Sequence, residues 1–216
     1  MTTMPLILEL SLFVLFTTIL AAYVEHKYCI FDKIMRIKYH ILNPEVEIRF
    51  FTTYTSNVPF ANLKPILIST FQNCCDHIRV DKNSNHKLEI LVDSSYCVSF
   101  QAISNEEIYF QSDNIKMKMN SMVTVAENML SLLDNIAENI ISKNYACNVN
   151  NYTVHLCLPF KKLICRNLVS NSANAHAYKF VMYNEGYSNE MLAFEDLVRI
   201  KAKKKDDLLK LMELFT

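Results

Sequence analysis

Cysteine and histidine side chains gather in the last third of the sequence, where they could bind a metal ion. They are Cys147, His155, Cys157 and Cys165. A structural zinc site usually takes closely spaced Cys or His pairs across a turn, such as CxxC. Here His155 and Cys157 alternate along a predicted strand and share one face, but no CxxC pair accompanies them. The spacing therefore favours ordinary strand residues, and we expect no metal and no other cofactor.

A second group, Cys74-Cys75-Asp76-His77, combines thiols with a base. A nucleophilic cysteine needs its base within hydrogen-bonding reach, and adjacent residues on a helix point about 100° apart. These neighbours therefore do not form a dyad by themselves. Adjacent carboxylates fall at predicted turns and helix surfaces, whereas acid–base catalysis needs a shielded site. The pairs are Glu106-Glu107, Glu195-Asp196 and Asp206-Asp207. No catalytic residue is predicted, and the pattern favours a protein that is not an enzyme.

The one concentrated charge feature is the run RIKAKKK at residues 199–205. Its basic side chains could contact anionic lipid head groups, each contributing about 1 kcal/mol near a bilayer. They are Arg199, Lys201, Lys203, Lys204 and Lys205. A solvated strand end or helix face is the simpler interpretation. Nucleic acid is not expected as a partner, because Lys+Arg and Asp+Glu both total 22 and leave no net attraction for a polyanion.

The first 24 residues could anchor the chain in a membrane. Glu9 is the only charge in residues 5–24, and a helix of about 20 residues spans the ~30 Å hydrocarbon core of a bilayer. Glu9 lies near the start, where it can reach the interface or pair with a partner's charge. The leader has no Lys or Arg and no clear cleavage site, so an uncleaved single span is favoured over a signal peptide.

Basic residues follow this segment and none precedes it, which places the rest of the chain in the cytoplasm. Seven irregularly spaced cysteines agree with a reducing compartment. The glycosylation sequon Asn151-Tyr152-Thr153 points instead to an exported or lumenal domain. We prefer the orientation given by the basic residues.

The stretch PLILELSLFVLFTTILAA resembles the N-terminal apolar helix of type IV pilin-like proteins, with Glu9 at the fifth position when Pro5 is counted first. This resemblance implies an exported subunit that assembles through the helix. The sequence departs from the family at the processing site, where Met4 stands in place of a glycine and the leader is uncharged. The pilin-like subunit is therefore kept as an alternative.

The remaining sequence predicts a juxtamembrane helix over residues 25–44 and one soluble α+β domain over residues 45–216. The domain begins with a strand, VEIRF, and a helix, FANLKPILISTFQNCC, in which Pro65 is expected near the start. Three alternating runs, KLEILV, YCVSFQAI and EIYFQ, then predict an antiparallel meander. Glycine occurs once, so phosphate-binding glycine loops are excluded and Asn, Asp and Ser must form the turns.

An amphipathic helix over residues 120–142 should pack on the meander. The order helix, three strands, helix resembles profilin-like and longin-like domains in topology, which implies no function. Two strands, YTVHLCL and AYKFVMY, follow, then a strand or helix to about Ile200 and a C-terminal helix begun by Asp206 and Asp207. No internal repeat is visible.

These observations predict a single-pass membrane protein whose cytoplasmic domain acts as a binding, tethering or assembly module. Its expected partners are the lipid bilayer and a protein. The alternatives are a membrane-bound enzyme with a dispersed site around His155 and Cys157, and an exported pilin-like or lumenal subunit.

Overall fold

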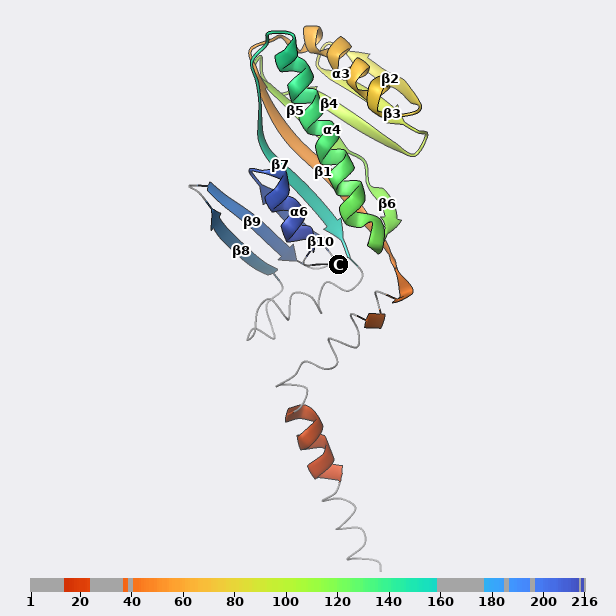
Figure 1. Cartoon of the computed structure of the whole chain (residues 1–216), viewed down its shortest axis with the longest axis vertical. Helices are drawn as coiled ribbons and strands as arrows, with labels where there is room; N and C mark the ends of the chain where they lie inside the picture. Colours follow the sequence, from red (N-terminus) through yellow and green to blue (C-terminus); the bar gives the residue numbers. More distant parts are fainter. Residues whose placement is uncertain are drawn as a thin grey trace, which may run out of the picture. The chain divides into compact units, whose positions relative to one another are not determined.

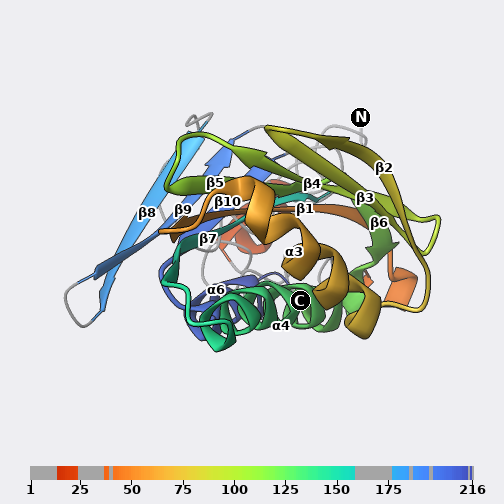
Figure 2. The same cartoon turned by 90° about the horizontal axis from the view of Figure 1, so that it is seen from above.

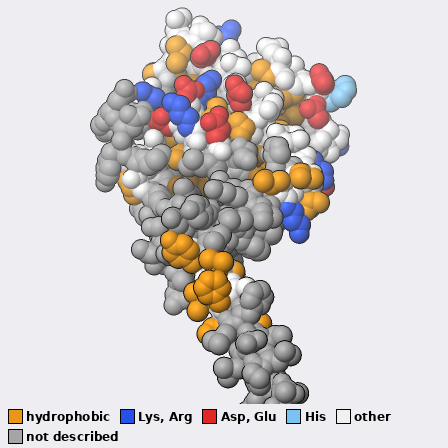
Figure 3. All heavy atoms as spheres, turned by 60° about the horizontal axis from the view of Figure 1, so that its bottom comes forward, with side chains coloured by type: hydrophobic (Ala, Val, Ile, Leu, Met, Phe, Trp, Pro, Cys, Tyr) orange, Lys and Arg blue, Asp and Glu red, His pale blue; other side chains and the backbone are white. Residues whose placement is uncertain are grey.

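The computed structural model describes residues 14–23, 37–38, 41–158, 177–184, 187–194, 197–213 and 215. The chain divides into two compact units, Met1–Asn43 and Pro44–Thr216. In the first unit, residues 14–23 form a helix with exposed apolar side chains, seen as a hydrophobic group in Figure 3. Within the described ranges, no helix is both long enough and apolar enough to cross a bilayer. Most of the predicted juxtamembrane helix, and Glu9, lie outside the described residues.

The second unit is built on a ten-stranded sheet in which neighbouring strands are antiparallel. The strand order is β2-β3-β4-β5-β1-β7-β10-β9-β8, and β6 pairs with β1 beyond the end of β5. The strands are β1 (Glu45–Ser56), β2 (Ile78–Ser84), β3 (Lys87–Val92), β4 (Tyr96–Ala102), β5 (Glu107–Ser112), β6 (Ile115–Lys118), β7 (Cys147–Cys157), β8 (Ala177–Asn184), β9 (Tyr187–Phe194) and β10 (Leu197–Ala202).

Three helices pack on one face of this sheet, as the view in Figure 2 shows. They are α3 (Phe60–Cys74), α4 (Met122–Ser142), which follows a short 3-10 turn, η1 (Met119–Ser121), and α6 (Lys205–Glu213). The apolar stripe predicted for α4 is buried along its length. Phe71 of α3 meets Phe100 of β4 edge to face at 5.9 Å between ring centroids. The predicted class, α+β with an antiparallel sheet packed by helices, is confirmed.

The two halves of the sheet repeat one arrangement. The strands β1, β5, β4 and β3 lie in order on one side of the β1–β7 boundary, and β7, β10, β9 and β8 lie in the same order on the other. A helix follows the last strand of each half, α4 after β5 and β6, and α6 after β10. The two halves thus share the order of four strands on either side of β1 and β7, which lie side by side in Figure 1.

The sequence missed parts of this layout. Five strands, β2 to β6, separate α3 from α4, so the predicted order of helix, three strands and helix was wrong. Pro65 lies inside α3, which begins at Phe60 and not near the proline. The first turn forms there because the buried side chains of Phe60 and Leu63 attach it to the core.

The turns follow the chemistry expected of a glycine-poor chain. Asp93 and Ser94, between β3 and β4, have φ values of 47° and 55°. The Ser95 N–H donates to the Val92 carbonyl at 2.9 Å, which closes a type I′ turn. Asn43 and Asn144 also adopt positive φ. Aspartate, serine and asparagine therefore take the positions that glycine usually fills.

Candidate binding face

The face of the sheet opposite α3, α4 and α6 is hereafter called the open face, because none of these helices packs on it. Side chains alternate along each strand, so every second residue of β1, β5, β7 and β10 points to it. On β1 and β7 these residues are partly exposed, whereas their neighbours in the chain are almost all buried. The open face is therefore the large surface that these central strands present.

Three nitrogen-rich side chains form a row across the middle of the open face. Arg49 of β1 lies directly opposite His155 of β7, and His155 lies directly opposite Arg199 of β10. Side chains in such positions have Cβ atoms about 5 Å apart. The antiparallel register thus brings together residues that are far apart in the sequence.

Two aromatic rings adjoin this row. The ring of Phe51 lies 4.4 Å from that of His155 and 6.2 Å from that of Tyr109, between centroids. The guanidinium carbon of Arg49 lies 5.2 Å from the Phe51 centroid, a cation–π contact. We call Arg49, Phe51, Tyr109, His155 and Arg199 the central cluster; it extends over four adjacent strands, β5, β1, β7 and β10.

The charges in the central cluster are incompletely balanced. Burial lowers the pKa of His155, and the positive charges of Arg199 and Arg49 lower it further. Its imidazole is therefore neutral at pH 7. The Arg49 Nε–H donates to the Ser112 carbonyl at 3.0 Å. Within the described part of the chain, neither arginine forms an ion pair with a carboxylate. Two half-buried positive charges thus flank a neutral imidazole.

Glutamates occupy the surroundings of the central cluster on the same face. Glu47 lies 3.5 Å from the Lys116 ammonium and accepts a hydrogen bond from the Asn114 amide at 3.1 Å. Glu89 forms an ion pair with Lys87 at 2.5 Å. Glu190 of β9 lies opposite Lys201 of β10. The open face therefore carries glutamates and lysines side by side around the two arginines of the central cluster, rather than a uniformly basic surface.

The predicted basic run is divided between two sides of the sheet. Arg199 and Lys201 alternate on the open face with buried Ile200 and Ala202 between them. The Lys203 ammonium donates to the Asn150 carbonyl at 2.9 Å. Lys204 is exposed and precedes α6, and Lys205 begins that helix, where its ammonium lies 3.2 Å from the Asp134 carboxylate. The five basic residues do not form a single patch.

The Cys and His residues weighed as metal ligands do not form a cluster within the described part of the chain. His155 and Cys157 share the open face, as their alternation predicted. Cys147 is buried at the other end of β7, and Cys165 lies outside the described residues. No set of three His, Cys, Asp or Glu residues within the described ranges could hold a metal ion.

The Cys74-Cys75 pair lies at the end of α3. Burial, followed by the charge of Asp93, raises the pKa of Cys75 to about 11. The thiol is therefore protonated at neutral pH and is a weak nucleophile. Of the adjacent carboxylates, Glu106 is exposed in a turn, Asp206 is exposed on α6, and Glu195-Asp196 lies outside the described residues.

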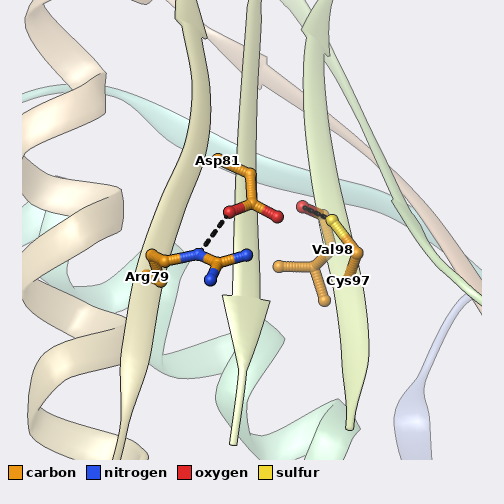
Figure 4. A network of polar contacts seen from close by, with 4 residues as sticks. All are labelled: Arg79, Asp81, Cys97 and Val98. Atoms are coloured by element: carbon orange, nitrogen blue, oxygen red, sulfur yellow. Dashed lines mark hydrogen bonds and ion pairs between the residues drawn. The ribbon is translucent and has the colours of Figure 1, made fainter. Parts of the chain in front are cut away.

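The edge strand β2 carries a charged bulge, shown in Figure 4. Arg79 and Asp81 form an ion pair at 2.6 Å on the face that also presents Cys97 of β4. The pairing register with β3 shifts between Val80 and Lys82. Bulges and charges on an edge strand disfavour pairing with another chain. This edge is therefore a poorer binding surface than the open face.

Sequence reasoning missed most of the central cluster. In the sequence, Arg49 is only one residue of the predicted strand VEIRF, and nothing singles out Phe51 or Tyr109. The sequence signal for these residues is the alternation of polar and aromatic side chains at the outward positions of neighbouring strands. That signal becomes a site only when the strand order and register are known.

Comparisons with known proteins assign this chain to no family. The sequence matches no described protein family and no curated protein. An aspartate kinase of Clostridium acetobutylicum is similar over 79% of this chain and 34% of that chain, with 6% identity and a TM-score of 0.24. A rolling circle replication initiator of Geobacillus stearothermophilus is similar over 77% and 78%, with 7% identity and a TM-score of 0.25. The regulatory subunit of aspartate kinase from Thermus flavus is similar over 80% and 98%, with 9% identity and a TM-score of 0.19. Such likenesses are too weak to show a common fold.

Proposed function

We propose that this chain is a membrane-anchored binding module that takes up a protein partner on its open face. The observation that carries the proposal is the central cluster, where two half-buried arginines that pair with no carboxylate of the described residues share the open face with two aromatic rings. Arginine and aromatic residues are enriched at the energetically important centres of protein interfaces. The cluster lies on the strands at the middle of the sheet, which suits a surface that must keep its shape on binding.

The membrane anchor is the second part of the proposal. It is supported by the apolar residues 5–24 and by the exposed apolar side chains of the helix at residues 14–23. The basic residues that follow residues 5–24 support a cytoplasmic domain under the positive-inside rule. Tethering the domain to a bilayer would confine its partner to the membrane surface. Extraction of membranes with alkaline carbonate should leave the full chain in the pellet and release a chain that lacks residues 1–24.

The sequon at Asn151 offers a check on this orientation. Asn151 lies on β7, half-buried on the open face, and its side-chain oxygen accepts a hydrogen bond from the Thr153 hydroxyl at 3.3 Å. A glycan there would cover the surface that we assign to the partner. A cytoplasmic domain carries no such glycan, so glycosidase treatment should leave the mobility of the full chain unchanged.

The binding surface is tested by photo-crosslinking of the full chain in its own membranes. A photoreactive amino acid replaces Thr153, in the centre of the open face, and in a matched variant it replaces Glu127, which is exposed on the helix side. We expect a discrete crosslinked protein from position 153 and none from position 127. Equal crosslinking from both positions, or none from position 153, would contradict the assignment of the open face.

A further inference from the structure

We propose that the partner segment on the open face is acidic, with one carboxylate seated over His155 between Arg49 and Arg199. The inference rests on the proposed function and specifies its partner. Its occupant is a protein segment with one or two Asp or Glu residues at its centre.

The first argument is the arrangement of charge in the row. The row places one guanidinium group on either side of a neutral imidazole, so the two positive charges lie two strands, about 10 Å, apart. No acidic side chain in the described part of the chain pairs with either arginine. A carboxylate from a partner, seated over the imidazole, would lie between the two guanidinium groups and would be attracted by both.

The second argument is that the side chain of Arg49 is already held in position. Its Nε–H is fixed by the Ser112 carbonyl, and its guanidinium carbon lies against the Phe51 ring. A guanidinium has five N–H donors, so the terminal nitrogens keep donors for a carboxylate. Because the side chain is already positioned, binding loses less conformational entropy than it would with a flexible lysine.

The mixed charges around the central cluster favour a protein over a polyanion. A bilayer of anionic lipid or a nucleic-acid strand presents negative charge over its whole length, and it would meet Glu47, Glu89 and Glu190 around the cluster. A protein segment can place its carboxylates at the centre and neutral or basic residues at its ends. The charge pattern of the open face is complementary to such a segment.

The test uses the full chain in detergent micelles and a capped eight-residue peptide, the glutamate peptide, with two glutamates at its centre and serines on both sides. The glutamine peptide, in which the two glutamates are replaced by glutamine, is its matched control. The His155 imidazole is followed by NMR during a pH titration. A carboxylate beside the ring favours its protonated form, so we expect the glutamate peptide to raise the pKa of His155 and the glutamine peptide to leave it unchanged. Arg199→Gln should weaken binding of the glutamate peptide by about tenfold, the loss typical of a charged hydrogen-bonding partner. Arg79→Gln, at the exposed edge, should leave it unchanged.

Two further probes identify the class of ligand. Oligodeoxythymidine and phosphatidylserine vesicles should bind more weakly than the glutamate peptide and should be insensitive to Arg199→Gln. Stronger binding of either probe through Arg199 would overturn the proposal, as would an unchanged pKa of His155 with the glutamate peptide.

Sequencing of the partner peptide captured at position 153 separates this inference from the proposed function. An acidic peptide supports both proposals. A peptide without Asp or Glu leaves the binding face intact and refutes the acidic partner, whereas the absence of any captured protein refutes the binding face itself.

Discussion

Thr52 lies on the helix-covered side of β1, and its hydroxyl oxygen has no hydrogen-bond partner among the described residues. Burying such a group costs about 1–3 kcal/mol. Valine has nearly the same shape and no hydroxyl, so Thr52→Val should raise the free energy of unfolding by about 1 kcal/mol. Denaturant titration of the full chain, followed by circular dichroism, measures the difference.

Ser112 provides the matched control for this substitution. Its hydroxyl is equally buried, but it accepts the Phe50 N–H and donates to the Asp113 carbonyl, each at 2.9 Å. Ser112→Ala should therefore lower the free energy of unfolding by about 1–2 kcal/mol. If Thr52→Val were as destabilising as Ser112→Ala, the Thr52 hydroxyl would have a partner and the prediction would be wrong.

His155 predicts a pH dependence of stability. Because burial and two nearby arginines lower its folded pKa below 6.5, the unfolded chain binds the proton first as the pH falls. The resulting penalty on the free energy of unfolding is absent above the ordinary pKa of histidine. It grows as the pH falls from that value towards the folded pKa of His155. His155→Gln removes the penalty, so the free energy of unfolding should decline less between about pH 7 and about pH 5. An identical decline in both proteins would show that His155 is protonated as easily in the folded chain as in the unfolded chain.

At this scale the sequence predicted residue environments better than residue partners. The shared face of His155 and Cys157 followed correctly from their alternation. The position of Arg49 opposite His155 did not, because alternation along one strand does not determine which residue of a distant strand lies opposite. Arg199 was named for its place in a basic run, whereas its position in the fold depends on the pairing of β10 with β7.

Asp134 connects three elements on the helix-covered side. Its carboxylate accepts a hydrogen bond from the Tyr152 hydroxyl of β7 and lies 3.2 Å from the Lys205 ammonium of α6. Burial and the hydrogen bond to Asp134 raise the pKa of Tyr152, so the phenol stays protonated as the donor. Asp134→Ala should lower the free energy of unfolding by about 2 kcal/mol, because Tyr152 would lose its acceptor.

A double-mutant cycle separates the two contacts of Asp134. Coupling with Tyr152→Phe should exceed coupling with Lys205→Met, since the lysine side chain is 36% exposed and such pairs contribute about 0.2–1 kcal/mol. Denaturant titrations of the single and double variants give both values. A larger coupling to Lys205 would mean that the ion pair, and not the phenol, holds α4 against its neighbours.

Elements with a strong burial pattern were predicted and those without one were missed. The runs KLEILV and YCVSFQAI correspond to β3 and β4, in which alternate side chains are buried. Nearly all side chains of β2 are exposed, so only backbone pairing with β3 defines the strand and the sequence gives no periodic signal. The same reasoning explains β6, a short strand with no buried side chain.

The strand order shared by the two halves of the sheet was also invisible in the sequence. Burial constrains side-chain type only loosely, so two halves can have the same topology without similar sequences. The boundary between them is nevertheless well packed. Ile48 and Phe50 of β1, with Val154 and Leu156 of β7, are fully buried, and α4 packs against both strands.

This packing predicts that the two halves unfold together. Residues of β1 and β7 are paired on both sides and buried beneath α4, so their amides can exchange only when the whole unit opens. The edge strand β2 is paired with β3 and exposed, so it should exchange first. Hydrogen exchange followed by mass spectrometry should therefore give one slow class of peptides that includes β1, β7, β5 and β10. If β7, β10 and β9 instead exchanged together ahead of β1, β5 and β4, the halves would be separate folding units joined only by their contact in the native state.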